Sequence, residues 1–213
     1  MKKLLIIISF IIVVSFLIIG AIPNQDKNID EFNKLTTELI KADNFLENGV
    51  RVEYTTKNNI NAEYDLVKND FIKIFGENIN LLDNSIEYSD ECKEVKAVFW
   101  NKNDTSYIRI DYLNKNKNIE VMEIRNILAE IINNKKEKVK YFDFVKLKII
   151  EEEKDDTKEI IRNYMKNEEF LEVENGIIGK GILKDKTKIN VGYMQYAKGE
   201  YLIIGTPVIF VTY

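Results

Sequence analysis

The sequence contains no histidine, one cysteine and two prolines among its 213 residues. Without histidine the chain has no Ser-His or Cys-His catalytic pair, no histidine-bound zinc and no histidine pH switch. The single cysteine, Cys92, excludes an internal disulfide and a cysteine-rich metal site. The composition therefore argues against the commonest metal centres, and we expect no metal or cofactor.

Catalytic motifs are also missing. The strings G-x-S-x-G and S-x-x-K do not occur, and neither does a Gly-rich phosphate loop. General acid-base chemistry would fall to carboxylates, lysine or tyrosine, and no pair stands out among the 35 acidic residues. The sequence therefore predicts a protein that is not an enzyme. With 45% hydrophobic and 31% charged residues, it has the balance of a folded globular chain.

The N-terminal residues 1–23 form the one long hydrophobic run. Lys2 and Lys3 precede an uncharged stretch from Leu4 to Ile22. As a helix this stretch is about 28 Å long, close to the ~30 Å hydrocarbon core of a bilayer. The positive flank predicts a single-pass anchor with the rest of the chain outside the cytoplasm. The alternative is a signal segment cleaved after Ala21, which gives a secreted protein.

The charge balance bears on the partner. Leaving out Lys2 and Lys3 changes the formal net charge from −4 to −6. A dedicated nucleic-acid binder carries a strong basic excess, so the exported part is a poor match for that class.

Residues 24–114 predict a first α+β subdomain. Asn28 and Glu31 can cap a helix over 28–46, which Asn48-Gly49 would end. Alternation over 50–54 predicts a strand, and apolar spacing over 62–75 predicts a second helix. Strands are expected at 86–89, 94–100 and 105–113, the last two forming a hairpin.

Residues 115–213 repeat the same order and predict a second subdomain. Helices are expected over 118–133 and, capped by Asp156, up to 164, with a long strand over 139–149 between them. Strands are expected at 170–174, 177–183, 188–198 and 201–213. The sequence therefore predicts duplicated helix-strand-helix-antiparallel-strands units, with helices on one face of an antiparallel sheet.

The last predicted strand carries a resemblance to a known family. It runs from Tyr201 to Tyr213 through Gly205-Thr206-Pro207, and it is similar to the terminal strand of the YwmB family. Thr105-Ser106-Tyr107, at the start of a central strand, is similar as well. The resemblance implies a duplicated fold of the TATA-box-binding type, an exported protein of spore-forming Gram-positive bacteria, and an envelope or sporulation setting. The family has no established activity.

The strand over 139–149 supplies the candidate binding residues. Its odd positions are mostly apolar and predicted to face inward, with Asp143 as the exception. Its even positions place four cations around two aromatic rings on one face: Lys138, Lys140, Phe142, Phe144, Lys146 and Lys148. Interleaved basic and aromatic residues are typical of surfaces that hold polyanions. The alternative is a half-buried strand with lysines on the wet side and the rings covered by a neighbouring element.

Two functions remain at this point. The first is a membrane-anchored, non-catalytic extracytoplasmic module that binds an envelope protein or a cell-envelope polymer. The second is binding of nucleic acid or another polyanion through the sheet, as the family label implies. Export and the net charge favour the first.

Overall fold

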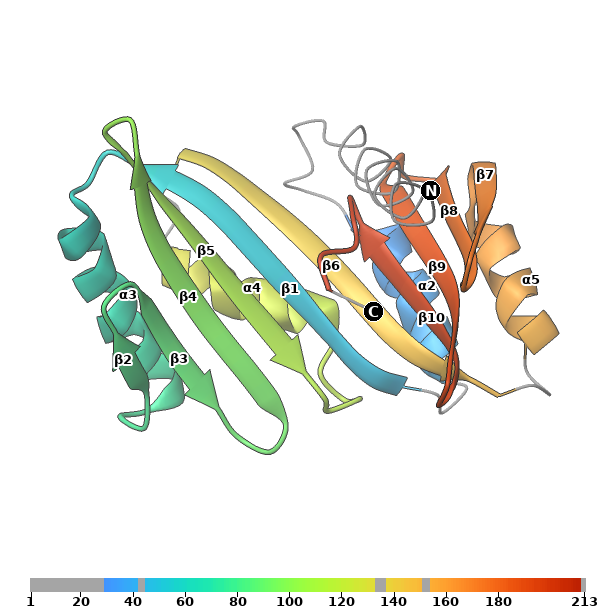
Figure 1. Ribbon diagram of the computed structural model, residues 1–213, viewed down its shortest axis with the longest axis horizontal. Coiled ribbons are helices and arrows are strands. Elements are labelled where there is room, and N and C mark those ends of the chain that lie inside the picture. The colour runs from blue at the N-terminus through green and yellow to red at the C-terminus, as the bar shows by residue number, and fades with distance from the viewer. Residues whose placement is uncertain (1–28, 42–44, 133–136, 151–153, 212–213) are drawn as a thin grey trace, which may run out of the picture.

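The computed structural model describes residues 29–41, 45–132, 137–150 and 154–211. These residues form a ten-stranded antiparallel sheet and four helices, so the predicted α+β class is confirmed. The helices lie behind the sheet in the view of Figure 1, and the face toward the viewer carries none of the described helices. We call these the helix-covered face and the open face.

The two halves contain the same elements in the same order. The first half consists of α2 (Asp30–Ile40), β1 (Phe45–Thr56), α3 (Ile60–Phe75), β2 (Asn80–Leu82), β3 (Ser85–Ser89), β4 (Lys93–Lys102) and β5 (Thr105–Asn114). The second half consists of α4 (Val121–Ile132), β6 (Glu137–Ile149), α5 (Lys154–Tyr164), β7 (Lys166–Val173), β8 (Gly176–Ile182), β9 (Lys188–Tyr196) and β10 (Gly199–Thr206).

One continuous sheet joins the halves, in the order β2-β3-β4-β5-β1-β6-β10-β9-β8-β7. In each half the last strand returns to pair with the first long strand, β5 with β1 and β10 with β6. The halves meet where β1 pairs with β6 at the centre of the sheet. The predicted boundary at residue 114/115 falls between β5 and α4.

Burial follows the periodicity of each element. On β5, buried and half-buried residues alternate strictly, which places Ile108, Ile110 and Tyr112 on the helix-covered face. The helices close this face with apolar stripes, such as Phe32, Leu35 and Leu39 of α2. The buried residues of both halves form one connected core cluster.

The first helix and strand differ from the sequence prediction. α2 ends at Ile40, and Leu46 lies in β1. Asn28, the predicted cap, lies outside the described residues, and no side chain caps the helix at Ile29. Asn48 and Gly49 do not end a helix but lie buried within β1.

Two long-range contacts explain why Asn48-Gly49 lies within a strand. The Asn48 side chain donates to the Ile119 carbonyl and accepts from Asn114 Nδ2, both at 2.8 Å. A Cβ at Gly49 would meet the Phe144 ring at 2.6 Å and would also collide with the Tyr112 carbonyl. These residues therefore serve contacts across the sheet, which outweigh the local preference of Asn-Gly for a helix end.

The end of the chain also departs from prediction. β10 stops at Thr206, and the strand predicted to continue to residue 213 is wrong beyond that point. After a cis peptide at Thr206-Pro207, residues 207–211 turn back over the open face. Ile209 packs on Gly205, and the Phe210 ring contacts the Phe144 ring edge-on, with centroids 5.1 Å apart. This segment covers part of the central strands.

Two other predictions concern helix ends and the membrane. α5 begins at Lys154, so Asp156 lies in its first turn and does not cap it, although its charge still suits the positive helix end. In the portion that the structure describes, no helix is long and apolar enough to cross a bilayer. The predicted anchor at 1–23 lies outside the described residues.

Candidate functional site

The predicted binding strand, β6, lies at the centre of the sheet between β1 and β10. Its odd positions face the helices as predicted: Val145 and Leu147 are buried, and Val139 and Tyr141 pack against the core. Asp143, the polar exception, is fully buried beneath α4. Arg125 of α4 donates two hydrogen bonds to its carboxylate, at 2.7 and 2.6 Å. Burial raises the pKa of the Asp143 carboxyl, and the Arg125 guanidinium acts in the opposite direction.

The even positions of β6 do not form a continuous strip of exposed side chains. Phe144 is fully buried between Gly49 and Phe210, so its ring is not available for stacking on a ligand. Lys146 lies 3.6 Å from Glu47 Oε1, and only 21% of its side chain is exposed. Phe142 is half-buried, whereas Lys140 and Lys148 are exposed.

A β-bulge removes Lys138 from the row. Glu53 of β1 lies opposite Lys140, but Thr55, two residues on, lies opposite Glu137, three residues back. The extra residue is accommodated at Lys138, whose φ is +49°. Because opposite residues share a face, Glu137 follows Lys140 on the open face. The strict alternation predicted from the sequence is therefore wrong at this end of the strand.

The structure thus separates the predicted cations into two groups. Lys140 and the displaced Lys138 lie at one end of β6, and Lys148 lies at the other, about 26 Å away at the rise of a β-strand. The buried Phe144 and the paired Lys146 lie between them.

Lys140 and Phe142 instead join residues of other strands. The register brings three rows together on the open face across β4, β5, β1 and β6. In the first row Trp100 of β4 pairs with Tyr107 of β5. In the second row Arg109 of β5 and Lys140 of β6 pair with the same residue of β1, from its two sides. Phe142 lies in the third row, two residues after Lys140 on β6. We call these five residues the open-face patch.

The aromatic part of the open-face patch consists of exposed Trp100 and the half-buried residues Tyr107 and Phe142. The Trp100 and Tyr107 rings stack with centroids 5.7 Å apart and an interplanar angle of 16°. Trp100 is 40% exposed although it is the only tryptophan of the chain. Burial of a large aromatic side chain usually stabilises a fold, so a stacked pair whose tryptophan is exposed is a candidate contact surface.

The open-face patch also contains two cations, Arg109 and Lys140, with Glu53 of β1 between them. Arg51 binds both carboxylate oxygens of Asp111, at 2.6 and 3.0 Å, and its guanidinium lies 4.6 Å from the centre of the Phe210 ring. Arg109 Nε lies 3.4 Å from the same carboxylate without hydrogen-bond geometry. Two guanidinium groups therefore share one carboxylate, and Arg109, 35% exposed, keeps donors free for a ligand.

Sequence reasoning found β4 and β5 but missed this pairing. The hairpin composition of residues 101–104 was visible, and it already implied that Trp100 and Tyr107 flank the turn at similar distance. The pairing of Trp100 with Tyr107 across this hairpin, together with the fact that Trp100 is the only tryptophan in the sequence, was the signal from which the site could have been predicted.

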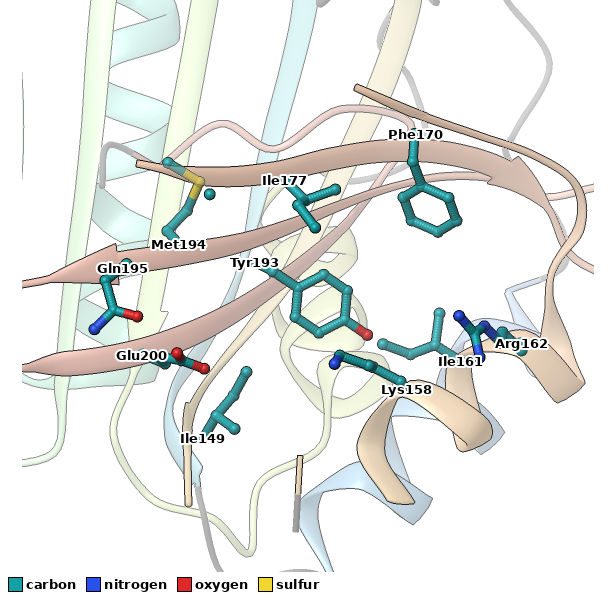
Figure 2. A pocket seen from close by; sticks show the side chains of 11 residues that line it. Ile149, Lys158, Ile161, Arg162, Phe170, Ile177, Tyr193, Met194, Gln195 and Glu200 are labelled. Carbon is teal, nitrogen blue, oxygen red and sulfur yellow. The ribbon is translucent and has the colours of Figure 1, made fainter. Parts of the chain in front are cut away.

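A second feature is a cavity of about 520 Å³ on the helix-covered face of the second half. Figure 2 shows its walls converging from α5, the end of β6 and the strands β7 to β9. The apolar lining consists mainly of Ile149, Ile161, Phe170 and Ile177. Phe170 and Ile177 are 46% and 38% exposed, so these walls face water.

Polar groups gather at one side of this cavity. The Tyr193 hydroxyl points toward α5, near Lys158 and Arg162 (Figure 2). Burial raises the pKa of Tyr193, Arg162 opposes the rise and Glu168 adds to it, so the phenol stays protonated at neutral pH. Gln195 and Glu200 lie on the other side of the ring.

The two halves differ in how this space is filled. In the first half, α3 has 16 residues and its Phe75 ring packs against Phe71, Tyr88 and Tyr112, with centroids 5.0 to 6.2 Å apart. In the second half, α5 has 11 residues. A Cβ at Gly179 of β8 would meet the Phe170 ring at 2.5 Å, so that ring packs directly against the strand. The shorter helix and the close packing of this ring on β8 leave the space open.

The described residues hold no group of three or more Asp, Glu, Cys or His side chains that are placed to bind a metal ion. Cys92 is exposed. Its backbone N–H donates a hydrogen bond to Asp90 Oδ1, and its carbonyl accepts one from the Lys115 N–H.

Comparisons with known proteins add little to this geometry. No family model matches the sequence, and no curated protein matches it either. Among solved structures, the chain is similar to the crystal structure of DynU16, a protein of the dynemicin biosynthetic locus, at 10% identity. The match covers 74% of this chain and 86% of that chain, with a TM-score of 0.28. A likeness at this level identifies neither family nor function, and the resemblance to the YwmB family stays a prediction.

Proposed function

We propose that the protein is a membrane-anchored, non-catalytic extracytoplasmic module that binds a cell-envelope polymer through the open-face patch. The observation that carries the proposal is the stacking of exposed Trp100 on half-buried Tyr107, beside the free donors of Arg109. The hydrophobic segment 1–23 supports export and anchoring.

An envelope polymer suits this surface better than nucleic acid does. Aromatic rings present flat apolar area that packs against the faces of sugar rings, while guanidinium and ammonium groups bind hydroxyl, carboxylate or phosphate oxygens. A phosphate backbone requires a longer continuous row of cations, and on β6 that row is interrupted at Phe144 and Lys146. The formal net charge of −4 also opposes nucleic acid.

Cosedimentation of the full chain, in mild detergent, with purified insoluble cell-wall material tests this function. Trp100→Ala should weaken binding at least about tenfold, since aromatic anchors dominate interface energetics. Leu66→Ala is the matched control because Leu66 is 51% exposed but lies on α3, away from the open face.

Variants that reverse the charge of single lysines distinguish the possible partners. Lys140→Glu should also weaken binding, whereas Lys148→Glu, at the far end of β6, should not. Trp100-dependent capture by an envelope protein, with no cosedimentation on wall material, would identify a protein partner instead. Equal binding of Trp100→Ala and the wild type to wall material contradicts the proposal.

The proposed location of the chain, outside the cytoplasm and anchored in the membrane, is tested separately. Protease added to intact cells should digest the chain beyond residue 23 and leave the N-terminal segment in the membrane. Release of a soluble product beginning after Ala21 would mean a secreted protein with the same binding surface. Full protection from the protease would contradict export.

We also infer that the two halves descend from one duplicated unit. The identical order of elements and the matching return of β5 to β1 and β10 to β6 support this inference.

A further inference from the structure

The cavity between α5 and strands β7 to β9 is separate from the open-face patch, since it lies on the opposite face of the sheet and shares no residue with the patch. Its volume of about 520 Å³ falls within the range of roughly 300–1,000 Å³ that is usual for small-molecule sites. Apolar walls around a few converging polar groups are the usual composition of such sites.

The apolar walls select the body of the ligand. Between the two polar sides, the lining is formed by the side chains of Ile149, Ile161, Ile177 and Phe170, which offer no hydrogen-bond donor or acceptor. A peptide or sugar would lose hydrogen bonds to water on entering this space, whereas a hydrocarbon chain would not. Exposed Phe170 and Ile177 would be covered by such a chain, and burial of that apolar surface stabilises the complex.

The polar side selects the head group. Within the described ranges, Tyr193 Oη forms no hydrogen bond and Arg162 has no carboxylate within ion-pair distance. Lys158 Nζ lies 3.6 Å from Asp155 Oδ1, a carboxylate that is 97% exposed and therefore a weak partner. Three donors thus face the cavity from one side, and Glu200 lies on the other.

We propose that this cavity binds a monoacyl carboxylate, a molecule of the fatty-acid class. Its carboxylate accepts hydrogen bonds from Arg162, Lys158 and the Tyr193 hydroxyl. Its hydrocarbon chain lies along Phe170, Ile177 and Ile161. A carboxylate matches the site because its two oxygens accept about four hydrogen bonds and its single charge is met by two cations.

Photolabelling tests the proposal on the full chain in phosphatidylcholine vesicles. The probe is a fatty acid with a diazirine at the end of its chain, and labelled peptides are identified by mass spectrometry after irradiation. Labels should map to α5, β7 and β8. Dodecanoate in excess should suppress them, whereas dodecyltrimethylammonium, with the same chain and the opposite charge, should not.

Three variants assign the parts of the site. Ile177→Trp fills the cavity and should abolish labelling. Leu171→Trp is its control, because Leu171 of β7 lies on the opposite face of the sheet from Ile177 and is similarly exposed, at 40%. This variant should leave labelling unchanged. Arg162→Gln should raise the dodecanoate concentration needed for half-suppression by at least about tenfold, because it removes a charge-assisted hydrogen bond. Lys198→Gln, an exposed charge in the β9–β10 turn, is its control.

Tyr193→Phe removes only the hydroxyl, so it tests the head-group contact even if the other variants do not fold. It should keep the melting temperature and weaken dodecanoate competition by roughly threefold to tenfold. Labelling no higher than in vesicles without protein, labels confined to the first half, or equal competition by dodecyltrimethylammonium would each overturn the proposal. Unchanged labelling of a folded Ile177→Trp variant would do so as well.

Discussion

Removal of the Asp143 carboxylate should be among the most damaging single changes to the fold. Asp143 is completely buried and Arg125 is 11% exposed, with two hydrogen bonds of 2.7 and 2.6 Å between them. In an Asp143→Val variant the guanidinium remains beneath the sheet without its counter-charge. The ring of Tyr141, 4.7 Å from the guanidinium carbon, remains as a favourable neighbour but carries no charge.

The expected loss follows from this burial. Breaking a buried ion pair on one side costs about 3–5 kcal/mol, because one charge is left without a partner. For a chain of this size, that loss corresponds to a decrease of roughly 6–20 °C in the melting temperature. Arg125→Met combined with Asp143→Val removes both charges. The double variant should therefore recover most of the loss, within about 1–2 kcal/mol of the wild type.

Urea unfolding, followed by the fluorescence of the single tryptophan Trp100, measures these free energies. The surface pair of Lys180 and Glu169 is the control, with an Nζ to Oε2 distance of 2.8 Å and exposed side chains. Lys180→Gln should change the free energy of unfolding little.

Two results would refute the reasoning. One is a loss below about 1 kcal/mol in Asp143→Val, which would mean that Arg125 reaches water once its partner is gone. The other is a double variant as unstable as the sum of its single changes, because an interacting pair must deviate from additivity.

Three further changes test other parts of the structure. Phe210→Ala should lower the free energy of unfolding by roughly 2 kcal/mol, about half the cost for a fully buried ring. It should also increase the rate of amide hydrogen exchange around Phe144. An unchanged exchange rate would mean that the C-terminal segment does not cover this strand. Hydrogen bonds from Lys93 and the backbone hold the pKa of Asp90 below its usual value. Its contribution to stability is therefore present above about pH 4 and is lost as the pH falls, so Asp90→Asn should flatten the acid side of a melting-temperature profile. Cys92→Ser should leave the melting temperature unchanged, because the side chain is exposed and serine is of similar size.

The regular parts of the fold were predictable because their signals are local. Alternation along residues 105–113 matches β5, which extends one residue further, and apolar spacing over 62–75 matches most of α3. The inward face of β6 was also correct, including the recognition that Asp143 breaks the pattern. The partner of Asp143 was not predictable, since Arg125 lies eighteen residues away on a helix and resembles any other charged helical residue.

The errors arise where a distant contact overrides a local preference. Asn48 lies in a strand because Ile119 and Asn114 satisfy its amide, and none of these residues is near it in sequence. Lys138 leaves its expected face because of a single extra residue relative to β1. The candidate sites depend on register between strands, and the cavity depends on the length of α5, neither of which periodicity reveals.

The central pairing of β1 with β6 has a consequence for how such a chain arises. Each half, taken alone, would expose the full length of its longest strand, 12 residues in β1 and 13 in β6, as an unpaired edge. An edge of that length recruits another chain. The two strands run antiparallel, so a single half of this kind could cover its edge with a second copy of itself, related by a two-fold axis. Under the proposed duplication, fusion of two copies would make permanent an arrangement that otherwise depends on concentration, and each copy could then change separately. The filled space beside α3 and the open cavity beside α5 are differences of the kind that such a fusion would permit.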